Sequence, residues 1–84
     1  MEKYVVARME WNGGIISHEC LGHHGKYKVS SLSDDLDIFD TVEEAKEAGF
    51  EYFGKGYVFK WCVCEYDPDS RILTGRCHYI HERK

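Results

Sequence analysis

The sequence predicts an α+β domain, in which a small antiparallel sheet of about four to five strands carries one α-helix on one face. Three observations predict this class of fold. Apolar residues alternate with polar ones over residues 3–11, one amphipathic helix pattern follows a capping signal at Thr41, and turn residues separate short apolar runs elsewhere. A chain of 84 residues has room for one domain, so we expect residues 1–84 to form a single unit.

The first strand is predicted over residues 3–11, because apolar side chains recur there at every second position. The side that we expect to pack against the helix carries Val5, Ala7, Met9 and Trp11. Asn12-Gly13-Gly14 predicts a hairpin turn, since glycine adopts positive φ at little cost, and Ile15-Ile16 returns to the sheet. Residues 20–25 are expected to form a loop, and residues 27–29 a short third strand.

The helix is predicted to begin after Thr41, which forms a capping box with Glu44, and to end at Gly54. The residues expected on its apolar face are Val42, Ala45, Ala48, Gly49, Tyr52 and Phe53. The small residues among them should let the helix lie close to the sheet.

Two further strands are predicted after the helix, over residues 57–66 and 72–80, with Gly75 as a candidate bulge. Asp67-Pro68-Asp69-Ser70 predicts the turn between them, because proline fixes φ and aspartate side chains bond nearby backbone. The expected order is therefore β-β-(β)-α-β-β.

The acidic residues of the chain are concentrated in one segment. Eight acids and one lysine give residues 34–51 a charge of −7, which leaves +3 on the remainder of a chain with net charge −4. Glu43, Glu47 and Glu51 recur at successive helical turns, away from the apolar face. Such a stripe either keeps the protein in solution or recognises a basic partner. The residues expected to bind a protein partner are Asp34, Asp35, Asp37, Asp40, Glu43, Glu44, Glu47 and Glu51.

The cysteines and histidines allow a second hypothesis, a small zinc-binding domain. Its candidate ligands are His18, Cys20, His23, Cys62, Cys64 and Cys77. Alternation on the last strand would also place His81 on the same face as Cys77. The chain lacks the closely spaced cysteine pairs of zinc knuckles, so we expect free, mostly buried thiols, no metal and no cofactor.

Nucleic-acid binding through a basic and aromatic sheet face is a third hypothesis, which the net negative charge disfavours. Its candidate residues are Lys26, Lys28, Arg71, Arg76, Arg83 and Lys84. Catalysis by Cys20 with His18 or His23 lacks an orienting acid and an oxyanion hole in the sequence, so we expect no enzyme.

The sequence therefore favours a non-enzymatic protein-interaction module whose acidic helix binds a protein with a basic surface. By analogy of size, charge and fold plan alone, small phage or mobile-element proteins that block a nucleic-acid-binding host factor have this character. No run approaches the roughly 18 apolar residues of a membrane span. The first residues lack the apolar stretch of a secretory signal, so we expect a cytoplasmic protein with reduced thiols. The identity of the partner and the oligomeric state stay open.

Overall fold

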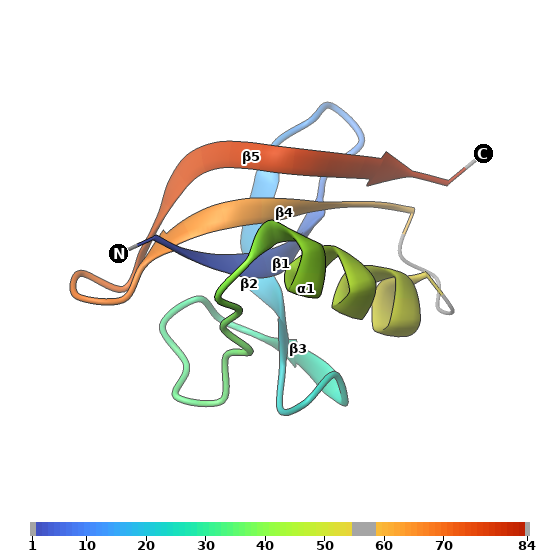
Figure 1. The fold of residues 1–84 in the computed structure, drawn as a ribbon. Coiled ribbons are helices and arrows are strands. Elements are labelled where there is room, and N and C mark those ends of the chain that lie inside the picture. Colours follow the sequence, from blue (N-terminus) through green and yellow to red (C-terminus); the bar gives the residue numbers. More distant parts are fainter. Residues whose placement is uncertain (1, 55–58, 84) are drawn as a thin grey trace.

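A computed structural model describes residues 2–54 and 59–83, which form one five-stranded antiparallel sheet and one helical segment (Figure 1). The strands are β1 (Lys3–Met9), β2 (Ile15–Gly22), β3 (Tyr27–Val29), β4 (Lys60–Asp67) and β5 (Ile72–Glu82). Between β3 and β4 lies the helix α1 (Val42–Ala48), which continues as the π-helical turn η1 (Gly49–Phe53). The strand order in the sheet is β3-β2-β1-β4-β5. The predicted α+β class is confirmed, as are the single antiparallel sheet and the single helical segment.

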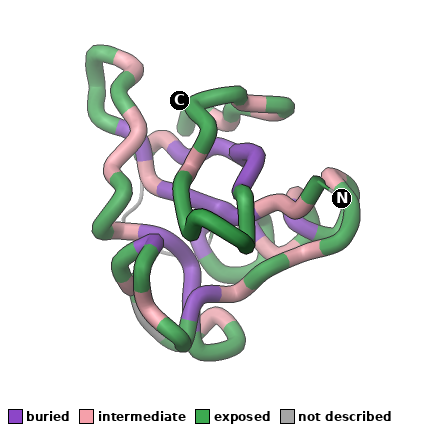
Figure 2. The backbone as a smooth tube through the Cα atoms, turned by 90° about the vertical axis from the view of Figure 1, so that its left-hand side faces the viewer, coloured by how far each residue is buried: buried purple, intermediate pink, exposed green. Residues whose placement is uncertain are grey.

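The central strands β1 and β4 are buried on both faces of the sheet, and Figure 2 shows the buried positions gathered in the middle of the molecule. On one face lies the helix-side cluster, formed by Val6, Leu21, Ala45, Phe53, Trp61 and Val63. On the other face lies the thiol-side cluster, formed by Val5, Ala7, Met9, Cys20, Leu36, Cys62, Cys64 and Tyr66. The domain therefore has two small cores that share one pair of strands.

The helix packs on the face of β1 opposite to the one that the sequence predicted. Its Ala45 contacts the cluster around Val6, whereas the neighbouring residues Val5 and Ala7 belong to the thiol side. Trp11 was expected to be buried beneath the helix, but β1 ends at Met9 and the Trp11 side chain is 74% exposed. The prediction failed because alternation does not say which face a helix covers when both faces of a strand are apolar.

The thiol-side cluster is covered by residues from both edge strands of the sheet, β3 and β5. Val29 of β3 and Leu73 of β5 both pack against this cluster, although the two strands are opposite edges of the sheet. Arg71 joins the turn between β4 and β5 to the loop that follows β3. Its guanidinium donates to the Leu32 carbonyl oxygen at 3.2 Å and pairs with the Asp34 carboxylate at 3.0 Å.

The helix begins as the sequence predicts, because the Thr41 hydroxyl accepts a hydrogen bond from the Glu44 amide at 3.1 Å. Gly49 brings the helix into direct contact with the sheet: a Cβ atom on this residue would lie 2.3 Å from a ring carbon of Trp61. The change to π-helical geometry at Gly49 alters the rotation per residue. Phe53 stays buried, whereas Tyr52, also expected on the apolar face, is 45% exposed.

Other strand boundaries also differ from the prediction, and β5 extends to Glu82. Residues 20–22 belong to β2, so the predicted loop is shortened to a turn over residues 23–26. The strand expected over 57–66 begins at Lys60, and residues 57–58 lie outside the described residues. The bulge at Gly75 is confirmed by its φ of +87° and by the irregular register between β4 and β5 beside it. In the described part of the chain, no helix is long and apolar enough to cross a membrane.

The contact between Gly49 and Trp61 generates the first testable prediction. Alanine normally stabilises a helix interior by about 1 kcal/mol relative to glycine. In Gly49→Ala the new methyl group would overlap the indole ring, so we expect a loss of about 1–3 kcal/mol in the free energy of unfolding, measured by urea denaturation. The control is Gly14→Ala, where the nearest atom would lie 3.5 Å away and the change should stay within about 0.5 kcal/mol. A stabilised Gly49→Ala variant would contradict this close packing.

Candidate functional site

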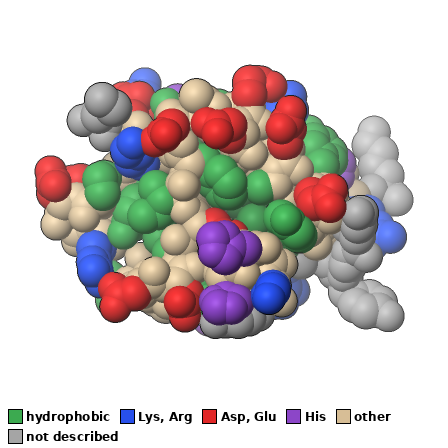
Figure 3. Space-filling view, turned by 60° about the horizontal axis from the view of Figure 1, so that its bottom comes forward, with side chains coloured by type: hydrophobic (Ala, Val, Ile, Leu, Met, Phe, Trp, Pro, Cys, Tyr) green, Lys and Arg blue, Asp and Glu red, His purple; other side chains and the backbone are tan. Residues whose placement is uncertain are grey.

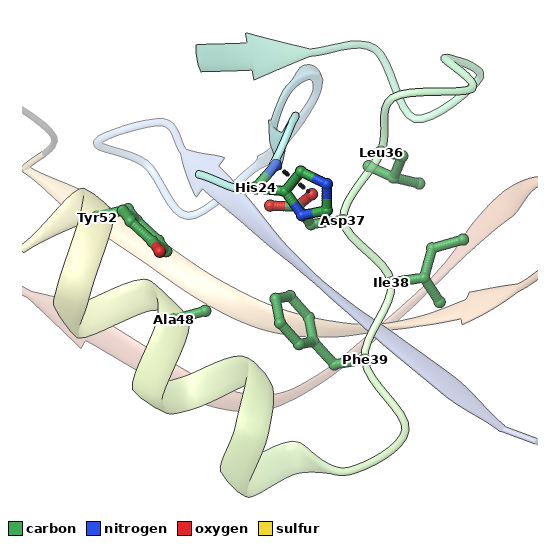
Figure 4. Close-up of a pocket in the computed structure, with 7 residues that line it drawn as sticks. All are labelled: His24, Leu36, Asp37, Ile38, Phe39, Ala48 and Tyr52. Atoms are coloured by element: carbon green, nitrogen blue, oxygen red, sulfur yellow. Dashed lines mark hydrogen bonds between the residues drawn. The ribbon is translucent and has the colours of Figure 1, made fainter. Parts of the chain in front are cut away.

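A groove runs along α1, between the helix and the extended segment that precedes it. It consists of two adjoining hollows of about 340 and 420 Å³, which share Phe39, Ala48 and Tyr52 as an apolar floor. One wall is formed by the acidic residues Glu44, Glu47 and Glu51. The other wall is formed by His24, Leu36, Asp37 and Ile38 (Figure 4). We call this surface the acid-lined groove.

The wall opposite the helix is fixed to the sheet by backbone hydrogen bonds. Phe39 and Tyr4 exchange two of them, at 2.8 and 2.9 Å, and form an isolated bridge at the start of β1. The Asp37 amide donates to the Leu21 carbonyl oxygen at 3.0 Å, and Leu36 bridges to Gly22 at the end of β2. The segment therefore has a defined position although the sequence predicted only a polar stretch there.

The Asp37 side chain holds the β2–β3 turn, which forms the end of this wall. One carboxylate oxygen accepts a hydrogen bond from the His24 amide at 2.8 Å (Figure 4). The other accepts one from the Gly25 amide, also at 2.8 Å. His23 and His24 both have positive φ, which is unfavourable for residues other than glycine. Asp37 therefore offsets backbone strain in this turn. The turn also contacts the helical segment, because a Cβ on Gly25 would lie 2.4 Å from the Tyr52 ring.

The four helical acids of the predicted binding surface are all exposed. Glu44 supports the N-cap Thr41, because its carboxylate accepts a hydrogen bond from the Thr41 hydroxyl at 3.1 Å. Among residues 2–54 and 59–83, the carboxylates of Glu43 and Glu47 form no hydrogen bond or ion pair. Figure 3 shows acidic side chains along one margin of this face, hydrophobic side chains in its middle and histidines beyond them.

The four acids of the preceding loop have local roles in the fold. Asp34 and Asp40 form ion pairs with Arg71 and Lys3, and Asp37 holds the turn. One oxygen of Asp35 lies 3.9 Å from Nδ1 of His23. The structure thus divides the predicted surface into a helical part that is exposed and a loop part whose carboxylates have partners within the fold.

The cysteines of the candidate zinc site come together on the thiol side, but the histidines do not join them. Cys20 and Cys62 flank Ala7 on either side, and Cys64 is the cross-strand partner of Cys77. The imidazoles of His18 and His23 are exposed. In the described ranges 2–54 and 59–83, no three or more His, Cys, Asp or Glu side chains form a group that could hold a metal ion.

A bulge on β5 decides where the last cysteine lies. Val63 pairs with Tyr79 and the next residue, Cys64, pairs with Cys77, so β5 has one extra residue at this point. Cys77 therefore packs on the thiol side, whereas Tyr79 packs on the helix side. The prediction that Cys77 and His81 share a face is wrong for this reason.

The cysteine–histidine hypothesis for catalysis fits the structure poorly. Burial raises the pKa of the Cys20 thiol to about 12, so this thiol is protonated at neutral pH. Its S–H donates to the carbonyl oxygen of Ser17 at 3.5 Å. At neutral pH almost none of the Cys20 side chain is therefore the thiolate that rapid nucleophilic catalysis needs.

The basic residues of the nucleic-acid hypothesis do not form one platform. Lys28 pairs with Glu19 at 3.1 Å, and Arg71 pairs with an acid as described above. Lys28 and Arg76 lie on opposite edge strands, and Lys84 lies outside the described residues.

The sequence did not predict a cluster of titratable side chains on the helix-side face, formed by Tyr4, Glu65 and His78. Nε2 of His78 lies 3.1 Å from the Glu65 carboxylate, and the Tyr4 ring stands edge-on to the imidazole, with the ring centres 5.3 Å apart. The hydrogen bond from His78 holds the pKa of Glu65 below its ordinary value. These residues come from three strands, so no local spacing in the sequence could have grouped them.

Fold and site together define a small α+β domain with an acid-lined groove beside its helix. Comparison with known proteins adds no relative: no protein family, curated protein or solved structure matches the chain.

The bonds from Asp37 to the β2–β3 turn can be tested by Asp37→Asn. An amide retains one acceptor oxygen and loses the charge, so we expect a loss of about 1–2 kcal/mol in the free energy of unfolding and faster amide exchange at His24 and Gly25. The control is Asp69→Asn at the exposed β4–β5 turn, which should have little effect. Equal stability of the two variants would show that the carboxylate does not hold the turn.

The buried thiols generate a prediction for alkaline pH. Burial raises the pKa of Cys64 to about 11, although a hydrogen bond from the Gly75 backbone acts in the opposite direction. An unfolded thiol ionises near pH 8.5, so the unfolded state binds fewer protons than the folded state between that pH and about 11. The contribution of such a thiol to the free energy of unfolding should therefore be constant below pH 8.5. Above that pH the free energy of unfolding should fall, by at most about 1.4 kcal/mol per pH unit for each thiol.

The measurement is urea denaturation of the wild type and of Cys64→Ala between pH 7.5 and 10.5. Tyrosine ionisation affects both proteins alike, so the variant should lose stability less steeply with rising pH. Parallel curves for the two proteins would contradict the raised pKa of Cys64.

Proposed function

We propose that this protein is a non-enzymatic interaction module that binds a basic segment of another protein in the acid-lined groove. The observation that carries the proposal is the position of Glu47 and Glu51. These glutamates border an apolar hollow, and do not lie isolated on a solvated helix face.

The groove combines two kinds of recognition. The apolar floor of Phe39, Ala48 and Tyr52 would accept an aliphatic or aromatic side chain, which supplies affinity through burial. The glutamates along the wall would face lysine or arginine side chains of the same segment, which supplies orientation and a faster encounter. The carboxylates of Glu43 and Glu47 support this function, because neither of these two forms an ion pair with the described residues that a partner would have to displace.

The mode of action that we propose is competition in the cytoplasm. A protein that holds nucleic acid does so with a basic surface, and an acidic groove can occupy such a surface in place of phosphate. The concentration of −7 on residues 34–51 supports a partner of this kind.

The test is the double charge reversal Glu43→Lys with Glu47→Lys. The fold should survive, because both side chains are exposed and neither one caps the helix. The partner is first captured from cells with the wild-type protein as bait, and its affinity for each protein is then measured at several salt concentrations. We expect the variant to bind at least about tenfold more weakly and with a smaller salt dependence.

The matched control is Glu10→Lys with Asp69→Lys, at the two hairpin turns away from the groove. Both double variants raise the net charge from −4 to 0, so any difference between them reports the position of the charges. Unchanged affinity and salt dependence in the groove variant would contradict the proposal. An equal loss in both variants would mean that only the net charge matters.

A further inference from the structure

Cys64 and Cys77 face each other across β4 and β5. They are direct cross-strand partners, and the bulge at His78 places Cys77 on the thiol side, where Cys64 already lies. Partner residues in an antiparallel pair have Cα atoms about 4.5–5.5 Å apart. This spacing falls within the range of about 4.4–6.8 Å that a disulfide needs.

The surroundings distinguish this pair from the other thiols. All four cysteines are free, and Cys77 alone is partly exposed, so a small molecule in solution can reach it. The Cys77 side chain packs against the cluster that contains Cys62 and Cys64. Cys20 lies farther along the sheet, on β2, beyond β1.

We propose that Cys64 and Cys77 are a redox-active pair, which closes a disulfide across β4 and β5 when the protein meets a low-molecular-weight disulfide such as oxidised glutathione. This inference is independent of the groove and of its partner.

The chemistry proceeds in two exchange steps. The Cys77 thiolate attacks one sulfur of oxidised glutathione, which forms a mixed disulfide and releases one glutathione thiolate that takes up a proton. The Cys64 thiol loses its proton and attacks the Cys77 sulfur, which forms the internal disulfide and releases the second glutathione. One oxidised glutathione is thereby reduced to two thiols, and the two cysteines are oxidised.

The disulfide would make the stability of the domain depend on the ratio of oxidised to reduced thiols in solution. It closes a loop over the β4–β5 hairpin, which restricts the unfolded chain and fixes the register beside the bulge. For a loop of this length we expect the melting temperature to rise by roughly 10 °C on oxidation.

The experiment incubates the purified full chain with oxidised and reduced glutathione in varied ratios, followed by acid quenching and thiol counting in denaturant. We expect the wild type to lose two of its four thiols, with a mass decrease of about 2 Da and a higher melting temperature. Retention of all four thiols, or a stable glutathione adduct without an internal bond, would overturn the proposal.

Single substitutions identify the pair. Cys77→Ser and Cys64→Ala should each abolish the mass decrease, whereas Cys20→Ala and Cys62→Ala should retain it. Cys77 is partly exposed, so Cys77→Ser should fold even if one of the buried variants does not. A bond that survives Cys64→Ala but is lost in Cys62→Ala would assign the disulfide to a different pair and contradict the proposed one.

Discussion

The rest of the structure depends on the burial of the β1–β4 pair on both faces. Six consecutive residues of β1 pair with β4, and the middle of both strands is closed to solvent on either side. A short chain cannot cover both faces with helices, so α1 covers one and residues of the edge strands cover the other. The acid-lined groove and the thiol-side cluster are consequences of these two different covers.

The position of the groove follows from a contact inside the core. Gly49 allows the helical segment to rest on Trp61, and this contact carries the last helical turn over the β2–β3 turn. There Tyr52 meets Gly25, and the segment held by Asp37 completes the opposite wall. The glutamates project outward because the opposite side of the helix is buried. The surface that we propose for binding therefore depends on packing beneath it.

The fold class, the helix start at Thr41 and the exposure of the acidic stripe could be predicted from the sequence, because each depends on local spacing. The face of the sheet beneath the helix could not, since both faces of β1 are apolar. The place of Cys77 could not be predicted either, because a single extra residue at His78 reverses the alternation along β5. The wall around Asp37 was missed for another reason: its backbone bonds join segments that are distant in sequence.

The bulge at His78 also affects how readily copies of the protein can associate through the edge of the sheet. β5 is an edge strand of eleven residues, with exposed Ile72 and Ile80 along it, and such an edge offers unpaired backbone groups to any other extended chain. The irregular stretch between Gly75 and His78 breaks this row of donors and acceptors into two short pieces. The opposite edge, β3, has only three residues in the described structure. Neither margin of the sheet is therefore a long, flat template for strand addition, which protects the domain against edge-to-edge aggregation at high concentration.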